Sequence, residues 1–209
     1  MLVDLTCVEF ADKLAAKTPV PGGGGASAMA GALGAALGSM VCNYTIGKKK
    51  YKNVEEDVKL ILEKAALLQS KLLSLVDKDA VVFEPLSKAY AMPENTEEEK
   101  NLKEKIMEEA LVEASKVPME IMEAALEAIG LHEELLEKGS KMLISDVGVG
   151  VILCKAALQG AALNVFINTG VMKNRSFADL LNERAKTMLE TGITKADNIY
   201  KAVEGKLCK

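Results

Sequence analysis

Apolar residues recur every three or four positions along most of the chain, which is the spacing of one face of an α-helix. The pattern is clearest between residues 54 and 86, where it includes Val58, Ile61, Leu62, Ala65, Leu68, Leu72, Leu75, Val76, Val82, Phe83 and Leu86. It predicts one long helix. Pro85 predicts a bend in that helix, because proline has no amide hydrogen to donate.

The second half of the chain shows the same period. The segment "MPENTEEEK" ends the first long helix and opens another, whose apolar positions are Ile106, Ala110, Val117, Ile121, Ala125 and Ile129. Pro118 predicts a kink or a break within it. We expect a further helix from about Asp146 to Ile167 and a last one from about Ser176 to near the C-terminus. No alternating strand pattern is present, so the prediction is an all-α fold, an antiparallel helical bundle with long, partly kinked helices, forming one domain over residues 1–209.

Helix starts are marked by a hydroxyl residue with a carboxylate three positions later, the capping-box pattern. Three such pairs occur along the chain: Thr6 with Glu9, Thr96 with Glu99, and Ser176 with Asp179. Each pair predicts the beginning of a helix.

Residues 18–47 carry no charged side chain, and 26–46 are long enough to span a bilayer. Alanine and glycine supply most of that segment, however, so its hydrophobicity is modest, and every other predicted helix is amphipathic and charged. We therefore expect no membrane partner but a central helix, matched by the small-residue segment "KAALQGAALNVFIN" at 155–168. Both helices are too apolar to be solvated, which predicts at least a homodimer.

Composition narrows the partners and the compartment. The net charge is −4, the pI is about 5.3 and there is no tryptophan, so nothing indicates a nucleic-acid partner. The four cysteines form no CxxC pair, which predicts a reduced cytoplasmic protein whose thiols are small buried hydrophobes. The single histidine, His132, stands in the acidic run "GLHEELLEK", where we expect it to be solvated; no second histidine exists for a common zinc site.

The four glycines at 22–25 follow Val20-Pro21 at the start of the central helix. They serve either as a flexible turn or as a site where backbone amides approach a planar or anionic ligand, because helix N-termini attract anions. Neither the P-loop nor the dinucleotide fingerprint fits. Past the other end of this helix, Lys48, Lys49 and Lys50 either complement the helix dipole or recognise a substrate carboxylate, and Tyr51 adds a flat surface.

Without a histidine base, proton transfer would fall to carboxylates, lysines or tyrosines. Asp79, in "LVDKDAVVF", lies four residues before Phe83, so both point from one side of a helix. Asp146, in "LISDVGVG", stands at a helix start, where it is either an N-cap or a functional group. Asn164 and Asn168 lie one turn apart on an apolar helix, and their amides need structural or ligand partners.

Six segments together resemble, in order and spacing, the formiminotransferase-cyclodeaminase C-terminal-domain family: "PVPGGGGASAMAGALGAALGSMV", "GKKKY", "LVDKDAVVF", "MPENTEEEK", "LISDVGV" and "ALNVFIN". The resemblance covers nearly the whole chain. It implies an all-α fold, a homodimer or higher assembly, and a folate substrate.

The resemblance also implies a chemistry. The family includes methenyltetrahydrofolate cyclohydrolases, which convert 5,10-methenyltetrahydrofolate and water into 10-formyltetrahydrofolate. It also includes formimidoyltetrahydrofolate cyclodeaminases, which release ammonia to form the same methenyl ring. Neither needs a metal or a redox cofactor beyond the tetrahydrofolate substrate. The segments "TIGKKKY" and "ISDVGV" resemble the stand-alone cyclohydrolases more closely and favour that activity. The alternatives are the cyclodeaminase and a non-catalytic folate-binding helical protein.

Carried onto this sequence, the resemblance implies that Asp79 and Asp146 lie near the folate ring, one transferring a proton and the other stabilising cationic charge. The implied substrate-binding residues are Gly22, Gly23, Gly24, Gly25, Ser27, Lys48, Lys49, Tyr51, Asn164 and Asn168. Among these, we expect Lys48 and Lys49 to bind the glutamate tail of the folate.

Overall fold

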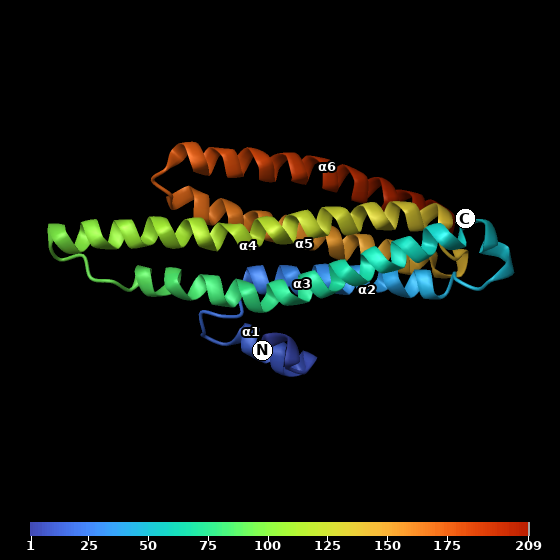
Figure 1. The fold of residues 1–209 in the computed structure, drawn as a ribbon, viewed down its shortest axis with the longest axis horizontal. Helices are drawn as coiled ribbons and strands as arrows, with labels where there is room; N and C mark the ends of the chain where they lie inside the picture. The colour runs from blue at the N-terminus through green and yellow to red at the C-terminus, as the bar shows by residue number, and fades with distance from the viewer. Residues whose placement is uncertain (209) are drawn as a thin grey trace.

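Helices account for nearly all of the structure, a computed structural model that describes residues 1–208 (Figure 1). The α-helices are α1 Cys7–Ala15, α2 Gly23–Asn43, α3 Glu55–Tyr90, α4 Glu97–Lys138, α5 Ile144–Val171 and α6 Arg175–Leu207. Short 3-10 turns lie at η1 Leu2–Asp4, η2 Lys49–Val54 and η3 Lys141–Leu143. No strand occurs within residues 1–208, so the predicted all-α antiparallel bundle is confirmed.

All three predicted helix starts are confirmed to within two residues, and two of the three predicted caps are confirmed. Thr6 and Thr96 cap α1 and α4, and each is paired with a glutamate in a capping box. The third pair lies at the start of α6, which begins at Arg175, but its capping role is wrong: the side chain of Asn174 accepts the amide of Phe177 at 3.1 Å and caps the helix in place of Ser176.

Both internal prolines lie inside continuous helices. α3 runs past Pro85, and α4 runs past Pro118 for a total of 42 residues. A break at Pro118 is therefore excluded.

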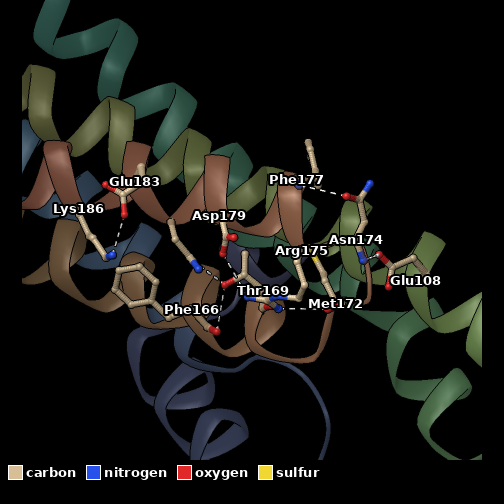
Figure 2. A network of polar contacts seen from close by, with 11 residues as sticks. Glu108, Phe166, Thr169, Met172, Asn174, Arg175, Phe177, Asp179, Glu183 and Lys186 are labelled. Atoms are coloured by element: carbon tan, nitrogen blue, oxygen red, sulfur yellow. Dashed lines mark hydrogen bonds and ion pairs between the residues drawn. The ribbon is translucent and has the colours of Figure 1, made fainter.

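The connection between α5 and α6 is held by charged hydrogen bonds (Figure 2). The carboxylate of Glu108 on α4 accepts the backbone amides of Lys173 and Asn174 at 2.7 and 2.9 Å. The Arg175 guanidinium donates to the carbonyls of Thr169 and Met172, which end α5. These bonds fix the turn that reverses the chain.

The two small-residue helices, α2 and α5, pack side by side and antiparallel, as predicted from their glycines and alanines. A β-carbon at Gly31 would lie 3.1 Å from Cβ of Ala157, and one at Gly34 would collide with Sγ of Cys154. The small residues are therefore needed for backbone approach, since larger side chains would push the helices apart.

One face of this helix pair is apolar and uncovered. It carries the exposed side chains of Leu33, Val149, Ile152, Leu163, Ile167 and Val171. At 100° per residue, these positions lie about a quarter-turn from the residues through which α2 and α5 touch. The exposed apolar residue of α2 and those of α5 consequently point to the same side of the helix pair. We call these six residues together the α2–α5 face. By length and composition either helix could also cross a membrane, although 56% and 44% of their apolar windows are buried in the bundle.

Two sequence-based expectations about burial are wrong. His132 is buried, with 1% of its surface exposed, because it lies in the 3.6-residue stripe of α4 between Ala128 and Leu135 despite its acidic neighbours. Its Nε2 lies 3.0 Å from the carbonyl of Gly34. Among the cysteines, Cys42 and Cys154 are buried as expected, whereas Cys7 and Cys208 are exposed near the chain ends.

Candidate active site

A cavity of about 190 Å³ opens where the N-terminus of α2 meets the C-terminal halves of α3 and α5 and the middle of α4. Its lining combines predicted site residues with apolar walls: Pro19, Val20, Gly22, Gly23, Gly24, Asp79, Val82, Phe83, Ala114, Pro118, Asn164, Ile167 and Asn168. We call it the glycine–asparagine pocket. Six residues chosen from the sequence, Gly22, Gly23, Gly24, Asp79, Asn164 and Asn168, are thus brought together from helices distant in the chain.

Asp79 is the one acidic residue among those that line the pocket. Burial raises the pKa of this carboxyl above its ordinary value, and a hydrogen bond from the Gly25 amide opposes that shift only in part. No lysine, arginine or histidine within residues 1–208 forms an ion pair with it. Asp79 is therefore a partly desolvated carboxylate that a cationic ligand would stabilise.

The glycine run explains how the carboxylate reaches the end of α2. A β-carbon at Gly24 would collide with the Asp79 carboxylate, so only glycine leaves the space that it occupies. The helix is capped by Gly22 without any side-chain hydrogen bond. The free amides of the first turn and the positive end of the helix dipole consequently favour negative charge at this position.

The two asparagines approach from α5, and each amide is held through its nitrogen. Asn164 Nδ2 donates to the Gly160 carbonyl at 2.9 Å, and Asn168 Nδ2 donates to the Ala114 carbonyl at 3.2 Å. Gly23 lies against Asn164, since a β-carbon there would be 3.5 Å from Nδ2. The nitrogen contacts leave the amide oxygens as the groups available to a ligand.

Sequence reasoning did not assign the apolar walls to the site. Val20, Val82, Phe83, Pro118 and Ile167 enclose the polar groups. The signal existed for one of them, because the four-residue spacing correctly placed Phe83 on the same side of α3 as Asp79. The others are recognisable only once the helices are packed together.

Two further predicted residues lie beside the pocket and support it. Gly25 contributes its amide to Asp79. Ser27 is buried, donates to the Gly23 carbonyl at 2.7 Å and packs closely against Gly160. Neither residue lines the cavity. Because Ser27 packs against Gly160, it holds the first turn of α2 against α5.

The remaining four predicted residues lie at the opposite end of α2 (Figure 1). Lys48 Nζ is 3.4 Å from Ser140 Oγ, and Tyr51 OH accepts the Lys141 amide at 3.0 Å, which lowers the pKa of Tyr51. Lys49 belongs to the same turn, η2. We call Lys48, Lys49, Tyr51 and Asp146 the lysine cluster.

The lysine cluster and the glycine–asparagine pocket are far apart within one chain. At 1.5 Å per residue, α2 separates them by about 30 Å, and Asp146 is about 27 Å from Asn164 along α5. Asp146 occupies the first turn of α5, whose N-cap is Leu143, so the N-cap reading of Asp146 is wrong. The structure does not bring Asp146 to Asp79 in a single subunit.

Residues 1–208 contain no group of three histidine, cysteine or acidic side chains placed to hold a metal ion. Burial raises the pKa values of the Cys42 and Cys154 thiols to about 12, which disfavours thiolate chemistry at either. The groups that line the pocket suit a planar cation. The carboxylate can balance its charge and accept a proton, the amide oxygens can accept hydrogen bonds from its N–H groups, and the apolar walls can pack against its ring faces.

Comparison with known proteins gives one consistent answer. The family described as Formiminotransferase-cyclodeaminase matches residues 6–187. The methenyltetrahydrofolate cyclohydrolase of Methylorubrum extorquens is 43% identical over 97% of both chains. The formimidoyltransferase-cyclodeaminase of Mus musculus is 29% identical over 98% of this chain but only 38% of its own.

A solved structure agrees in fold. The formiminotetrahydrofolate cyclodeaminase of Thermotoga maritima superposes with a TM-score of 0.81 at 31% identity, covering 99% of this chain and 98% of the other. The family match, the sequence similarity and the shared fold agree, and the chain belongs to the formiminotransferase-cyclodeaminase family.

Proposed function

We propose that the protein is a methenyltetrahydrofolate cyclohydrolase, which adds water to 5,10-methenyltetrahydrofolate and releases 10-formyltetrahydrofolate. The observation that carries this proposal is Asp79, a partly buried carboxylate without a cationic partner in residues 1–208, facing two oriented amides in one cavity. The 43% identity to a chain of that name supports the same substrate.

Asp79 has two tasks in this reaction. Its negative charge stabilises the cationic amidinium ring, whose carbon is the electrophile. As water attacks that carbon, the carboxylate accepts one of the water protons, and the adduct is a neutral tetrahedral carbon between N5 and N10. As the C–N5 bond breaks, the protonated Asp79 carboxyl gives its proton to N5. The hydroxyl on the tetrahedral carbon loses its proton to solvent as the formyl C=O forms on N10, so one proton is released overall and the carboxylate is regenerated.

The raised pKa of Asp79 suits the proton-accepting task. A carboxylate with an ordinary pKa is a weak base at neutral pH, and burial strengthens it. The free amide oxygens of Asn164 and Asn168 can accept hydrogen bonds from the attacking water or from ring N–H groups. On this proposal the tetrahydrofolate is the only organic group required, and no metal or redox cofactor takes part.

The size of the pocket divides the substrate into two parts. At about 190 Å³ it is smaller than the roughly 300–1,000 Å³ typical of drug-sized ligands. The pterin ring is therefore the part enclosed, and the glutamate tail extends outside. The tail's carboxylates would be bound by Lys48 and Lys49, and the 30 Å separation requires those lysines to come from another subunit.

A homodimer through the α2–α5 face meets that requirement. Leu33, Leu163 and Ile167 are each more than half exposed, which is a large apolar surface to leave in water. A two-fold axis near Leu33 reverses the partner's helices, so the partner's lysine cluster reaches the pocket. Ile167 belongs to both the face and the pocket, and the second copy would wall the cavity. We place this dimer in the cytoplasm, without membrane or nucleic-acid partners.

The decisive measurement follows the absorbance of 5,10-methenyltetrahydrofolate with and without protein. Protein-dependent loss of the methenyl chromophore that saturates with substrate supports the cyclohydrolase. Loss at the uncatalysed rate, together with saturable binding of the folate, would leave only a folate-binding protein.

The cyclodeaminase is the second candidate, and the solved Thermotoga maritima structure at a TM-score of 0.81 favours it. The same pocket could hold a formimino group whose carbon is attacked by N10. Release of ammonia from 5-formiminotetrahydrofolate, run beside the first assay, separates the two. We expect the cyclohydrolase kcat/KM to be the larger.

A further inference from the structure

Pro118, in the wall of the pocket, has no amide hydrogen and so leaves one carbonyl of α4 without its usual helix hydrogen bond. In a regular α-helix the carbonyl of Ala114 would accept the amide of residue 118. Proline has no hydrogen there, so that carbonyl has no donor from its own helix ladder. The side chain of Asn168, on α5, donates to it instead at 3.2 Å.

This contact settles which way the Asn168 amide points. Only the nitrogen of an amide can donate, so bonding to a carbonyl fixes Nδ2 toward Ala114 and Oδ1 away from it. Asn168 is 8% exposed and lines the pocket together with Ala114 and Pro118.

The free oxygen of Asn168 is reached by solvent. Within residues 1–208 the only fully buried side-chain nitrogen or oxygen without a hydrogen bond is Nδ1 of His132. Oδ1 of Asn168 also has no hydrogen-bond partner in these residues, but it does not belong to that fully buried class. It is therefore exposed to solvent in the pocket. It is available to whatever fills the pocket.

We propose that Pro118 is a positioning residue for Asn168: it leaves the Ala114 carbonyl free for the asparagine nitrogen and so presents Oδ1 to the substrate as a fixed acceptor. The group that it receives is a hydrogen-bond donor, either the attacking water or a ring N–H. This inference rests on the proposed function, but the coupling between Pro118 and Asn168 stands independently of it.

The first test is a double-mutant cycle on methenyltetrahydrofolate turnover. Asn168→Ala and Pro118→Ala should each lower kcat/KM by about tenfold or more, because a misplaced contact is nearly as costly as a lost one. The double variant should be no worse than Asn168→Ala alone. Losses that multiply would overturn the proposal. Pro85→Ala makes the same chemical change in α3 at an exposed residue that does not line the pocket, and it should retain wild-type turnover.

Asn168→Asp keeps the test informative if Pro118→Ala fails to fold. Aspartate retains an oxygen for the substrate but cannot donate to the Ala114 carbonyl when ionised. We expect it to lose at least as much activity as Asn168→Ala. Near-normal turnover of Asn168→Asp would show that the nitrogen contact does not matter.

A second readout does not depend on activity. In protein labelled with ¹⁵N-asparagine, the side-chain NH₂ signals of Asn168, assigned by their loss in Asn168→Ala, should exchange slowly with solvent. Exchange should accelerate in Pro118→Ala and not in Pro85→Ala. Unchanged exchange in Pro118→Ala would overturn the positioning role, whereas absence of turnover in the wild-type protein would count against the proposed function alone.

Discussion

The backbone of Gly24 lies directly against the carboxylate of Asp79, and a single methyl group on Gly24 would occupy the space of the carboxylate oxygens. This contact joins the start of α2 to the C-terminal half of α3. It makes the glycine run part of the candidate chemistry, because the carboxylate can sit at the end of α2 only if that residue has no side chain.

Gly24→Ala should therefore displace Asp79 and reduce turnover by more than about tenfold, since small displacements of reacting groups are costly. The backbone at Gly24 is not in the left-handed region, so the effect comes from the clash and not from backbone conformation. Initial rates with methenyltetrahydrofolate provide the measurement. Gly130→Ala is the matched control, because nothing lies within 4 Å of a β-carbon there. Equal activity of both variants would contradict the role of the contact.

Asp79→Asn should lower turnover by about a hundredfold, because it keeps the shape of the side chain and removes its basicity. The acid limb of the pH profile of kcat/KM should lie above the usual range for an aspartate, since burial raises this pKa. A variant that folds and retains near-normal turnover would exclude Asp79 as the proton acceptor.

The same substitution should stabilise the protein without substrate. A folded-state pKa above the unfolded value means that burying the charged carboxylate costs stability at neutral pH. The cost disappears below about pH 4, where an unfolded aspartate is protonated as well. Urea unfolding should give Asp79→Asn a higher free energy of unfolding at pH 7 and no such advantage near pH 3.5. A wild-type protein that is the more stable at pH 7 would argue against a desolvated carboxylate.

The sequence predicts relationships within one helix well and contacts between helices poorly. Periodicity located the long helices and placed Asp79 with Phe83, because spacing along one helix determines direction. It would also have buried His132, had the acidic neighbours not been given more weight than the 3.6-residue stripe. The motif resemblance grouped Asp146 with Asp79 but carried no distances, and the length of α2 separates them. The contact between Asn168 and Ala114 depends on how α4 meets α5, which no local pattern specifies.

His132 should make stability depend on pH in the mildly acidic range. Burial lowers its pKa from 6.5 to about 4, so the unfolded chain takes up a proton before the folded one does. Stability should be lost as pH falls from 6.5 to 4, by about 3 kcal/mol in total at 1.36 kcal/mol per pH unit. His132→Leu, which cannot titrate, should show a shallower slope of unfolding free energy over this interval. Identical slopes would mean that the imidazole is solvated after all.

The final prediction concerns the two aspartates and the homodimer. If the partner's lysine cluster completes the pocket, Asp79 of one subunit works with Asp146 of the other. Asp79→Asn and Asp146→Asn homodimers should both be nearly inactive. Their heterodimer, however, contains one site with both aspartates intact and one site with neither.

Co-expression of the two variants with different affinity tags, followed by purification through both tags, isolates that heterodimer. It should recover about half of the wild-type activity, because one of its two sites is intact. If both aspartates instead acted within one subunit, the heterodimer would be as inactive as its parents. If Asp146 had no role, the Asp146→Asn homodimer would itself be active. Light scattering at the assay concentration must give the mass of a dimer, and a fully active monomer would exclude the shared site altogether.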